Sequence, residues 1–487
     1  MVLENFNLGL TAIQANQLAL NIVSHNIANV NTPGYTRQRA EFITSQPQNA
    51  TPGQLGTGVL VEEIIRINDE FTQLQLNVEN RSLGEYTVRR EILQQLENIF
   101  NEPTDTGLQK SLNEFFSAWQ SLADSPEDIA SRVLVVEKGK TLARILNSMA
   151  TQLNALKSQI DDSVEMKVDK VNEITSQIAE LNDQIAKIEV GGIQNANDLR
   201  DKRDELLLEL NQILEVSVHE TQDNTLIVEA RGGVLVAGVY NIEIDAAVDS
   251  DGYLVPVDKE SGARIYPQSG ELQGYLDVRE DVIDDALDAL NSIAETLVEY
   301  VNRVHTRGAP LEQFTEVTSE TSLVSSGQAL NTLDWDFEPQ NGSFTISAYD
   351  SNGVFSEQHT ISINPGSDTL EDIRDRINTA FSSGSVVASI TSNKELVISS
   401  SSGYSFNFVN HSDASGDSSD FLLAMGINTF FTGTSALTID VSETIESNPE
   451  LIAAAKSNSP GDNRNALDIA SLQNELLLDS GLSLIHI

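Results

Sequence analysis

Few residues in this 487-residue sequence stand at spacings that support chemistry. The tripeptide Gly139-Lys140-Thr141 resembles the end of a phosphate-binding loop, but Leu134 stands where that loop requires glycine, and the segment has a helical pattern. The acidic stretch 413–420 offers the oxygen ligands that calcium prefers, but it lacks the alternating aspartates of a calcium loop, so we interpret it as a solvated loop. The histidines have no metal-ligand spacing; they lie at positions 25, 219, 305, 359, 411 and 486. We therefore predict no catalytic, cofactor or metal site, and no enzyme activity.

The overall composition argues against two kinds of partner. The formal net charge is −44, which repels nucleic acid and anionic lipid. The sequence contains no cysteine, so disulfides, thiolate zinc sites and cysteine nucleophiles are absent. No apolar run reaches the roughly 20 residues that span a bilayer, and the N-terminus lacks the basic and apolar regions of a cleavable signal peptide. We predict a folded protein with no nucleic-acid or membrane partner.

The N-terminal segment differs from the rest in charge and in pattern. Residues 1–60 hold two acidic and two basic side chains, whereas residues 320–450 hold 18 acidic and 3 basic ones. A near-neutral segment packs against copies of itself without charge repulsion, although an ordinary terminal helix has the same composition. Between residues 3 and 30 the apolar residues follow the alternating spacing of a coiled-coil seam, which consists of Phe6, Leu10, Ile13, Leu20 and Ile27. Pro33 and Gly34 end this helix.

A second helical region extends from residue 70 to residue 214. Within it, residues 153–188 repeat an apolar residue every three or four positions, with charged residues on the other faces, which predicts one long helix. We expect its apolar face, which includes Ile178, to pack against the helices at 70–150 and 277–305. The glycine pair at 191–192 ends it, and a new helix begins near Asn197.

Alternation between helical and period-two patterns predicts an α+β multidomain fold, a long helical-bundle rod with small β-rich inserts. The predicted parts are an N-terminal axial helix at 1–40, a helical rod at 41–215, a small β insert at 216–276, a returning helix at 277–320, an outer β-rich insert at 321–447 and a return to the rod at 448–487. This order is typical of β modules inserted into a helical rod.

Residues 18–38, read as LALNIVSHNIANVNTPGYTRQ, resemble the N-terminal signature of the axial proteins of the bacterial flagellum, the family of rod, hook and hook-associated proteins. The continuation through Arg37 resembles the hook-associated members more than the hook or rod members. Two further stretches agree, residues 108–122 with Trp119 and residues 301–308 with His305. The resemblance covers residues 1–45 strongly, 90–310 moderately and 321–447 weakly.

The resemblance implies a structural subunit that joins hook and filament by assembling into a ring. It implies three partners, namely the hook protein, a second hook-associated protein and copies of the chain itself, and an export chaperone before secretion. It places the protein outside the cell in the flagellum, after type III export without a cleaved signal. The residues expected to act in assembly are Phe6, Leu10, Ile13, Leu20, Asn26, Ile27, Asn29, Asn31, Pro33, Gly34, Tyr35 and Arg37.

Three expectations remain open at this point. The family pairs its N-terminal helix with a long C-terminal helix, and residues 480–487 do not continue such a helix, so we expect this sequence to lack it. A hook or rod subunit is an alternative within the family. From another class, the alternative is a surface protein whose insert at 321–447 binds or cleaves an extracellular ligand.

Overall fold

The computed structural model describes residues 2–51, 53–100, 107–191, 194–411, 416–459 and 461–477, with the backbone alone at 2–7 and Ala50. Contacts between residues divide the chain into two units. Unit 1 contains residues 1–95 and 156–282, and unit 2 contains residues 96–155 and 283–487. The expectation about residues 480–487 lies outside the described residues.

Unit 1 combines long helices with small antiparallel sheets. Its helices are α1 (Val2–Ala28), most of α2 (Glu70–Phe100), the second half of α4 (Ile129–Ile188), α5 (Asn197–Ile213) and α6 (Glu271–Asp277). Its strands are β1 (Gln38–Thr44), β2 (Gln48–Ala50), β3 (Gly53–Leu55), β4 (Val59–Arg66), β5 (Ser217–Glu220), β6 (Leu226–Ala230), β7 (Gly233–Ala237), β8 (Tyr240–Asn241), β9 (Ile244–Val248) and β10 (Leu254–Asp258). The sheets have the strand orders β1-β4, β2-β3, β5-β6-β7-β8 and β10-β9.

Unit 2 consists of helices and an outer β-rich part. Its helices are α3 (Leu108–Asp124), the first half of α4, α7 (Asp284–His305), α8 (Leu370–Ala380), α9 (Phe421–Met425), α10 (Glu443–Ser447) and α11 (Arg464–Ser471), with 3-10 turns at Leu330–Thr332, Pro449–Leu451 and Leu472–Asn474. Its strands are β11 (Glu316–Thr318), β12 (Gly342–Asp350), β13 (Phe355–Ile363), β14 (Val386–Ile390), β15 (Leu396–Ser400), β16 (Tyr404–Asn407), β17 (Phe431–Thr432) and β18 (Asp440–Val441). The larger sheets have the orders β13-β12-β16 and β11-β15-β14. The predicted α+β class, long helices with inserted small sheets, is confirmed.

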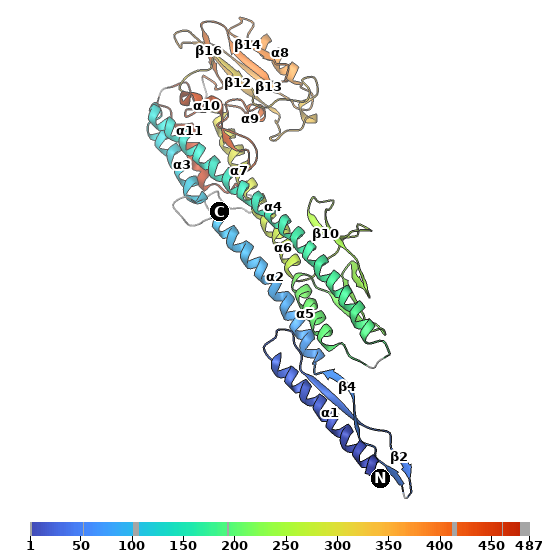
Figure 1. Ribbon diagram of the computed structural model, residues 1–487. Helices are drawn as coiled ribbons and strands as arrows, with labels where there is room; N and C mark the ends of the chain where they lie inside the picture. The colour runs from blue at the N-terminus through green and yellow to red at the C-terminus, as the bar shows by residue number, and fades with distance from the viewer. Residues whose placement is uncertain are drawn as a thin grey trace. The chain divides into compact units, whose positions relative to one another are not determined.

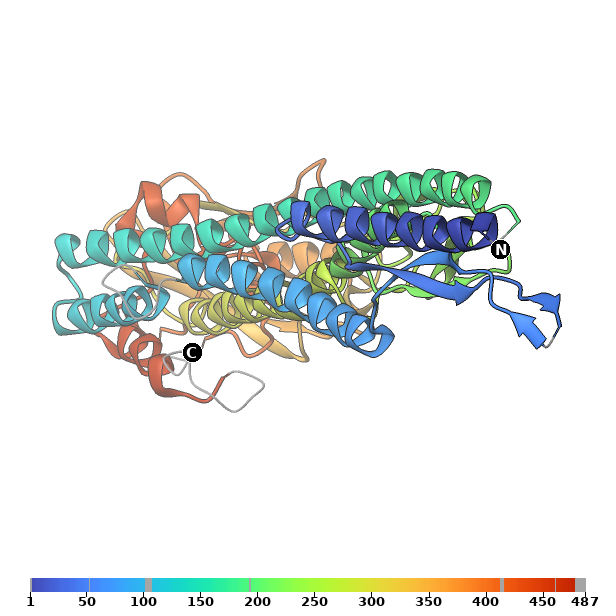
Figure 2. The ribbon, with the colours of Figure 1, turned by 60° about the horizontal axis from the view of Figure 1, so that its bottom comes forward.

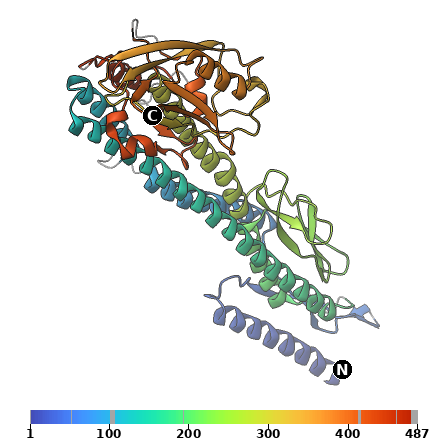
Figure 3. The same cartoon turned by 90° about the horizontal axis from the view of Figure 1, so that it is seen from above.

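The long helix α4 follows directly from its apolar repeat. Val164, Val171, Ile174 and Ile178 are fully buried, as a stripe at three- or four-residue spacing requires. The side-chain hydrogen bonds of this part of α4 run to the β insert, to α5, and, from Asp161, to Arg279 in the helical segment that precedes α7. Asn172 exchanges two hydrogen bonds with the backbone of Ile244, and the strands of the insert lie along the helix (Figures 1 and 3). The strands of the β insert are therefore neighbours of α4 that the apolar pattern alone does not predict, beside the helical stretch that contains Arg279.

The outer part of unit 2 has a core of its own. Helix α8 begins with a capping box in which the Thr369 hydroxyl and the Asp372 carboxylate each bond the other's backbone N–H. The helix contacts β13 and β14. The buried side chains that fill this core include Phe344, Ile346, Ile361, Ile373, Ile377, Ile398 and Phe406. This part therefore has the closed apolar core that an inserted domain requires.

Two local expectations are wrong. The acidic stretch 413–420 is only partly solvated: Asp417, in its described part, is buried and accepts hydrogen bonds from the backbone of Ser419 and Leu422. Burial raises the pKa of Asp417, and these N–H donors compensate the buried carboxyl group. The helix predicted to begin at residue 277 begins earlier, at Glu271, because α6 and a π-helical segment, Val278–Ile283, precede α7 without a break. Among the described residues, no helix has both the length and the apolar character needed to cross a membrane.

Candidate assembly surface

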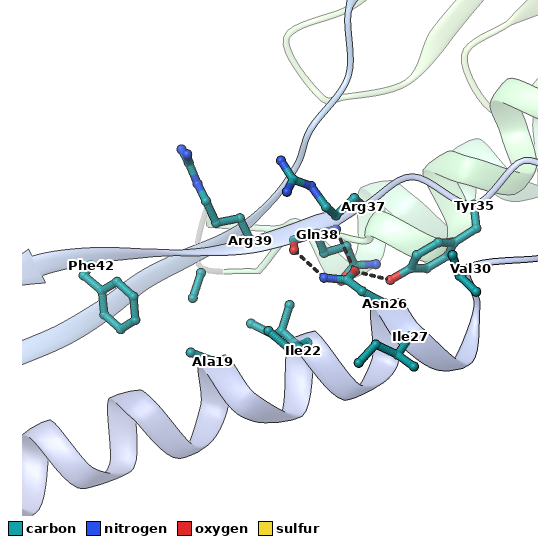
Figure 4. Close-up of a pocket in the computed structure, with 12 residues that line it drawn as sticks. Ala19, Ile22, Asn26, Ile27, Val30, Tyr35, Arg37, Gln38, Arg39 and Phe42 are labelled. Atoms are coloured by element: carbon teal, nitrogen blue, oxygen red, sulfur yellow. Dashed lines mark hydrogen bonds between the residues drawn. The ribbon is translucent and has the colours of Figure 1, made fainter.

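At the end of α1, the sequence signature forms a turn that side-chain hydrogen bonds hold in place. We call this turn, residues 26–38, the clamped turn. The side chain of Asn26 donates to the backbone oxygen of Gln38 (2.9 Å), and its own oxygen accepts from the Gln38 backbone N–H (2.9 Å) and the Tyr35 hydroxyl (2.7 Å). These bonds are drawn in Figure 4. The Tyr35 hydroxyl also lies 3.1 Å from Nδ1 of His25. The amide of Asn26 therefore joins the helix to the first residue of β1, and its hydrogen bonds lie within the chain.

Glycine is required at the corner of the clamped turn. Gly34 has a φ of +74°, which side-chain-bearing residues rarely adopt, and a Cβ placed there would lie 3.3 Å from Oε2 of Glu205. Asn29 donates to the backbone oxygen of His25 (3.1 Å), which caps the last turn of the helix. Pro33 and Asn31 are exposed in the same turn. The turn thus directs the chain from α1 back along it into β1.

A carboxylate of α5 anchors the clamped turn and the hairpin. The Asp201 carboxylate accepts from the backbone N–H of Thr36 (2.9 Å), from the Thr36 hydroxyl (2.5 Å) and from Nη1 of Arg66 at the end of β4 (2.8 Å). Asp204 accepts from the same Arg66 nitrogen at 2.7 Å. The side chains of Asp201 and Arg66 are 7% and 13% exposed, so the pair is largely desolvated. We call this group of Thr36, Arg66, Asp201 and Asp204 the Asp201 node.

The acidic surroundings affect Tyr35 in the turn. Burial raises the pKa of Tyr35, and the negative charges of Asp198 and Asp201 raise it further. The tyrosine therefore stays protonated at neutral pH and keeps its hydroxyl proton for the bond to Asn26. A hollow of about 300 Å³ between the turn and α5 includes these residues, Gly34 and Glu205 in its lining.

Helix α1 has one packed face and one open face. Ala15 and Ile22 are buried against the β1–β4 hairpin, which lies beside the helix (Figure 2). The predicted seam lies on the other face, where its side chains are exposed by 46%, 66%, 66% and 68% at Leu10, Ile13, Leu20 and Ile27. Phe6 belongs to the same seam, but its side chain lies outside the described residues. A helix held on one side thus presents an apolar stripe on the other.

A hollow of about 560 Å³ opens between α1 and β1, next to this stripe. Figure 4 shows Ile22 and Ala19 of the helix facing the strand and Phe42 at one end of the hollow. Arg37 and Arg39 extend from the strand away from the helix. Arg37 is exposed, and Arg39 pairs with Glu41. The signature therefore brings Asn26, Gly34 and Tyr35 into one bonded turn, whereas Arg37 and the seam lie on open surfaces.

The sequence patterns did not predict the Asp201 node. Thr36 and Asp201 are 165 positions apart, and no periodicity links them. One signal was present: Asp198, Asp201 and Glu205 stand at the i, i+3 and i+7 positions of α5, which places three carboxylates on one face. A row of this kind is usually solvated, and only the structure shows that the turn of the signature covers it.

The residues considered for chemistry occupy structural positions. Gly139 lies inside α4, where a Cβ would come within 2.9 Å of the Phe430 ring, and Lys140 pairs with Glu446. Nε2 of His359 lies 3.1 Å from Oε2 of Glu357, and the other carboxylate oxygen of Glu357 accepts from the Ser385 hydroxyl. In the described ranges no three His, Asp or Glu side chains are grouped so as to hold a metal ion.

Three family models match the chain. The flagella basal body rod protein model matches residues 6–36, the flagellar hook-associated protein FlgK helical domain matches 93–316, and the flagellin hook IN motif matches 343–402. The first match contains the clamped turn, and the third lies in the outer part of unit 2. The helical domain covers parts of both units.

Curated relatives agree with these matches. The flagellar hook-associated protein 1 of Bacillus subtilis (strain 168) is 30% identical over 334 residues, which are 61% of this chain and 66% of that protein. Its Escherichia coli (strain K12) counterpart is 31% identical over 313 residues, 62% of this chain and 57% of that protein. The chain thus matches 66% or less of the length of these relatives. The solved structure of the flagellar hook junction protein FlgK from Burkholderia pseudomallei is 18% identical with a TM-score of 0.48, and the match covers 78% of this chain and 66% of that one.

The axial signature, the helical domain and these relatives point to one class, the axial proteins of the flagellum. Within that class, the chain matches the flagellar hook-associated proteins.

The open face of α1 leads to a prediction about its dynamics. Its seam is exposed among the residues that the structure describes, and a lone amphipathic helix gains little from its own bonds. Backbone amides at 10–27 are therefore expected to exchange at least about tenfold faster than those at 164–178 of α4. Hydrogen exchange of the protein, shown to be monomeric by light scattering, measures this. Equal protection of the two segments in the monomer would refute the prediction.

Proposed function

We propose that this chain is a structural subunit of the bacterial flagellum that forms the junction between hook and filament. The observation that carries this proposal is the exposed apolar seam of α1, held in a set direction by the clamped turn and the Asp201 node. A soluble monomer gains nothing from a continuous apolar stripe, whereas a subunit that packs among copies of itself buries it. The name of its relatives, hook-associated protein 1, supports the same role.

The partners follow from the position of a junction. An adaptor ring needs side surfaces that match its own copies and two end surfaces that match different neighbours. We infer that these neighbours are the hook protein and a second hook-associated protein, and that an export chaperone binds the chain before secretion. The work of the subunit is mechanical and templating, outside the cell, and involves no turnover of a substrate.

The two alternatives predict different outcomes. A hook or rod subunit would share the signature of α1, but the match to the hook-associated helical domain at 93–316 favours the junction. A surface protein with a binding or hydrolytic insert would carry that activity in the outer part of unit 2. The match of residues 343–402 to the flagellin hook IN motif favours a structural insert. Protease assays and glycan-array binding of the full chain test the second alternative.

Deletion of the gene tests the proposal in the cell. Electron microscopy of the deletion strain is expected to show hooks without filaments, with filament protein shed into the medium. Complementation with the full gene restores filaments. Filaments of normal number and length in the deletion strain would overturn the proposal, and loss of the hook itself would favour a hook or rod subunit.

The substitution Gly34→Val tests the clamped turn. The left-handed backbone at Gly34 costs a residue with a side chain roughly 1–2 kcal/mol, which changes the turn without removing a core contact. We expect the full-length variant to fold and to be exported, yet to leave hooks uncapped, so that motility is lost and filament protein appears in the medium. The control is Gly56→Val, where a Cβ has no neighbour within 4 Å. Wild-type swimming by Gly34→Val would show that the turn has no role in assembly.

A further inference from the structure

His305, at the C-terminal end of α7, holds two distant segments of unit 2 by both of its ring nitrogens. Nδ1 lies 2.8 Å from the backbone oxygen of Asn428, and the backbone N–H of Ala453 donates to Nε2 at 2.9 Å. A backbone N–H only donates and a backbone oxygen only accepts, so Nε2 carries no proton and Nδ1 carries one. The geometry therefore requires a neutral imidazole.

The two segments are the loop 428–431 and the segment 452–455, through which the chain returns to the helices. Asn302, one turn before His305 on α7, accepts from the backbone N–H groups of Phe430 and Phe431 and donates to the Phe431 oxygen. Asn465 of α11 donates to the backbone oxygen of Ala453. Among the described residues of unit 2 that make these hydrogen bonds, His305 is thus the only one whose hydrogen bonding changes when it binds a proton near neutral pH.

The surroundings of His305 offer no stabilisation to a charged ring. The side chain is fully buried and packs edge-on to Trp119 of α3 and against Phe430 of the loop. From α4 the charged group that faces it is Arg132, which donates to the backbone oxygen of Ile452 at 2.7 Å. From the returning segment, the charge of Glu450 acts on Arg132. The loop and α11 contribute the neutral side chains of Asn428 and Asn465.

We propose that His305 is an acid-released latch for the returning segment and the loop of unit 2. When Nε2 binds a proton from solvent, it loses the lone pair that accepts the Ala453 N–H, and a charged ring is left beside Arg132 in an apolar site. The segment 452–455 and the loop 428–431 then separate from α7, which exposes the imidazolium to water. Unit 1 has no part in this network and keeps its structure.

The direction of the effect follows from the two states of the ring. Burial, with a smaller contribution from the charge of Arg132, lowers the pKa of His305 from 6.5 to about 4 in the closed state. In the open state the ring regains its ordinary pKa. The latch is therefore at full strength above about pH 6.5 and weakens as the pH falls toward 4.

Hydrogen exchange of the full chain between pH 6 and pH 4.5, corrected for intrinsic rates, tests the latch. Protection of the Ala453 amide is expected to fall about twentyfold over this range, while protection at 171–178 in unit 1 changes little. The variant His305→Gln, whose amide replaces donor and acceptor without titrating, is expected to remove the pH dependence. The matched control His359→Gln, a partly exposed histidine of the same unit, should keep it.

The outcomes separate clearly. A pH-independent protection of Ala453 in the wild type, or the same slope in His305→Gln, would overturn the proposal. If His305→Gln does not fold, nuclear magnetic resonance of the wild-type imidazole gives the answer. Titration of His305 near its ordinary pKa with the fold of unit 2 intact would refute the latch, whereas titration below pH 5 coupled to opening would support it.

Discussion

Asp201→Ala is expected to lower the free energy of unfolding of unit 1 by about 3 kcal/mol. The substitution removes the acceptor for the Thr36 N–H and hydroxyl and leaves the largely buried Arg66 with Asp204 alone. Removing one member of a buried ion pair is costly because the other charge stays desolvated. Denaturant unfolding measures the loss, and hydrogen exchange should show the hairpin β1–β4 as the part that is released.

Asp198→Ala is the matched control for this prediction. Asp198 stands on the same face of α5 and is exposed, and its carboxylate accepts one hydrogen bond, from the side chain of Gln38. Its removal should cost within about 1 kcal/mol, the usual net worth of one hydrogen bond. If the two variants lose the same stability, the Asp201 node does not anchor the N-terminal segment.

Ile178→Ala is expected to cost about 2–5 kcal/mol, the range for truncating a fully buried aliphatic side chain. One turn further along the same side of α4, the buried side chain of Asn182 donates to the backbone of Leu226 and Gly238 in the β insert. A cavity at Ile178 cannot close easily between a 60-residue helix and a hydrogen-bonded sheet.

The control for this substitution lies on the same helix. Met166 is 63% exposed, so Met166→Ala should change the free energy of unfolding by no more than about 0.5 kcal/mol. Denaturant titration of both variants gives the comparison. A loss at Ile178 as small as that at Met166 would mean that the insert does not cover this face of α4.

Much of the fold could be predicted from local patterns in the sequence. Both ends of α1 and the C-terminal end of α4 were predicted closely, because apolar spacing and helix-ending residues act within a few positions, whereas α4 begins at Ile129, well before the predicted residue 153. The turn at Pro33 and Gly34 was predicted for the same reason, since its conformation depends on adjacent residues. The α+β class followed from the alternation of these patterns along the chain.

The interactions that hold the site together could not be predicted in the same way. Thr36 meets Asp201 across 165 positions, and His305 meets Ala453 across 148. Such pairs are created by the folding of the whole unit and leave no period in the sequence. The burial of Asp417 was not predicted for a related reason. The backbone N–H donors that compensate its buried carboxyl group come together only when the loop folds.

The most direct test of the proposed junction is to locate the protein in the flagellum. A short epitope inserted after Gly353, in the exposed turn between β12 and β13 where a Cβ has no neighbour within 4 Å, should leave the fold intact. Gold labelling of this variant, in cells that swim normally, is expected to place the label in a single band at the boundary between hook and filament. Label distributed along the hook, the rod or the filament, or absent from the flagellum, would contradict the account.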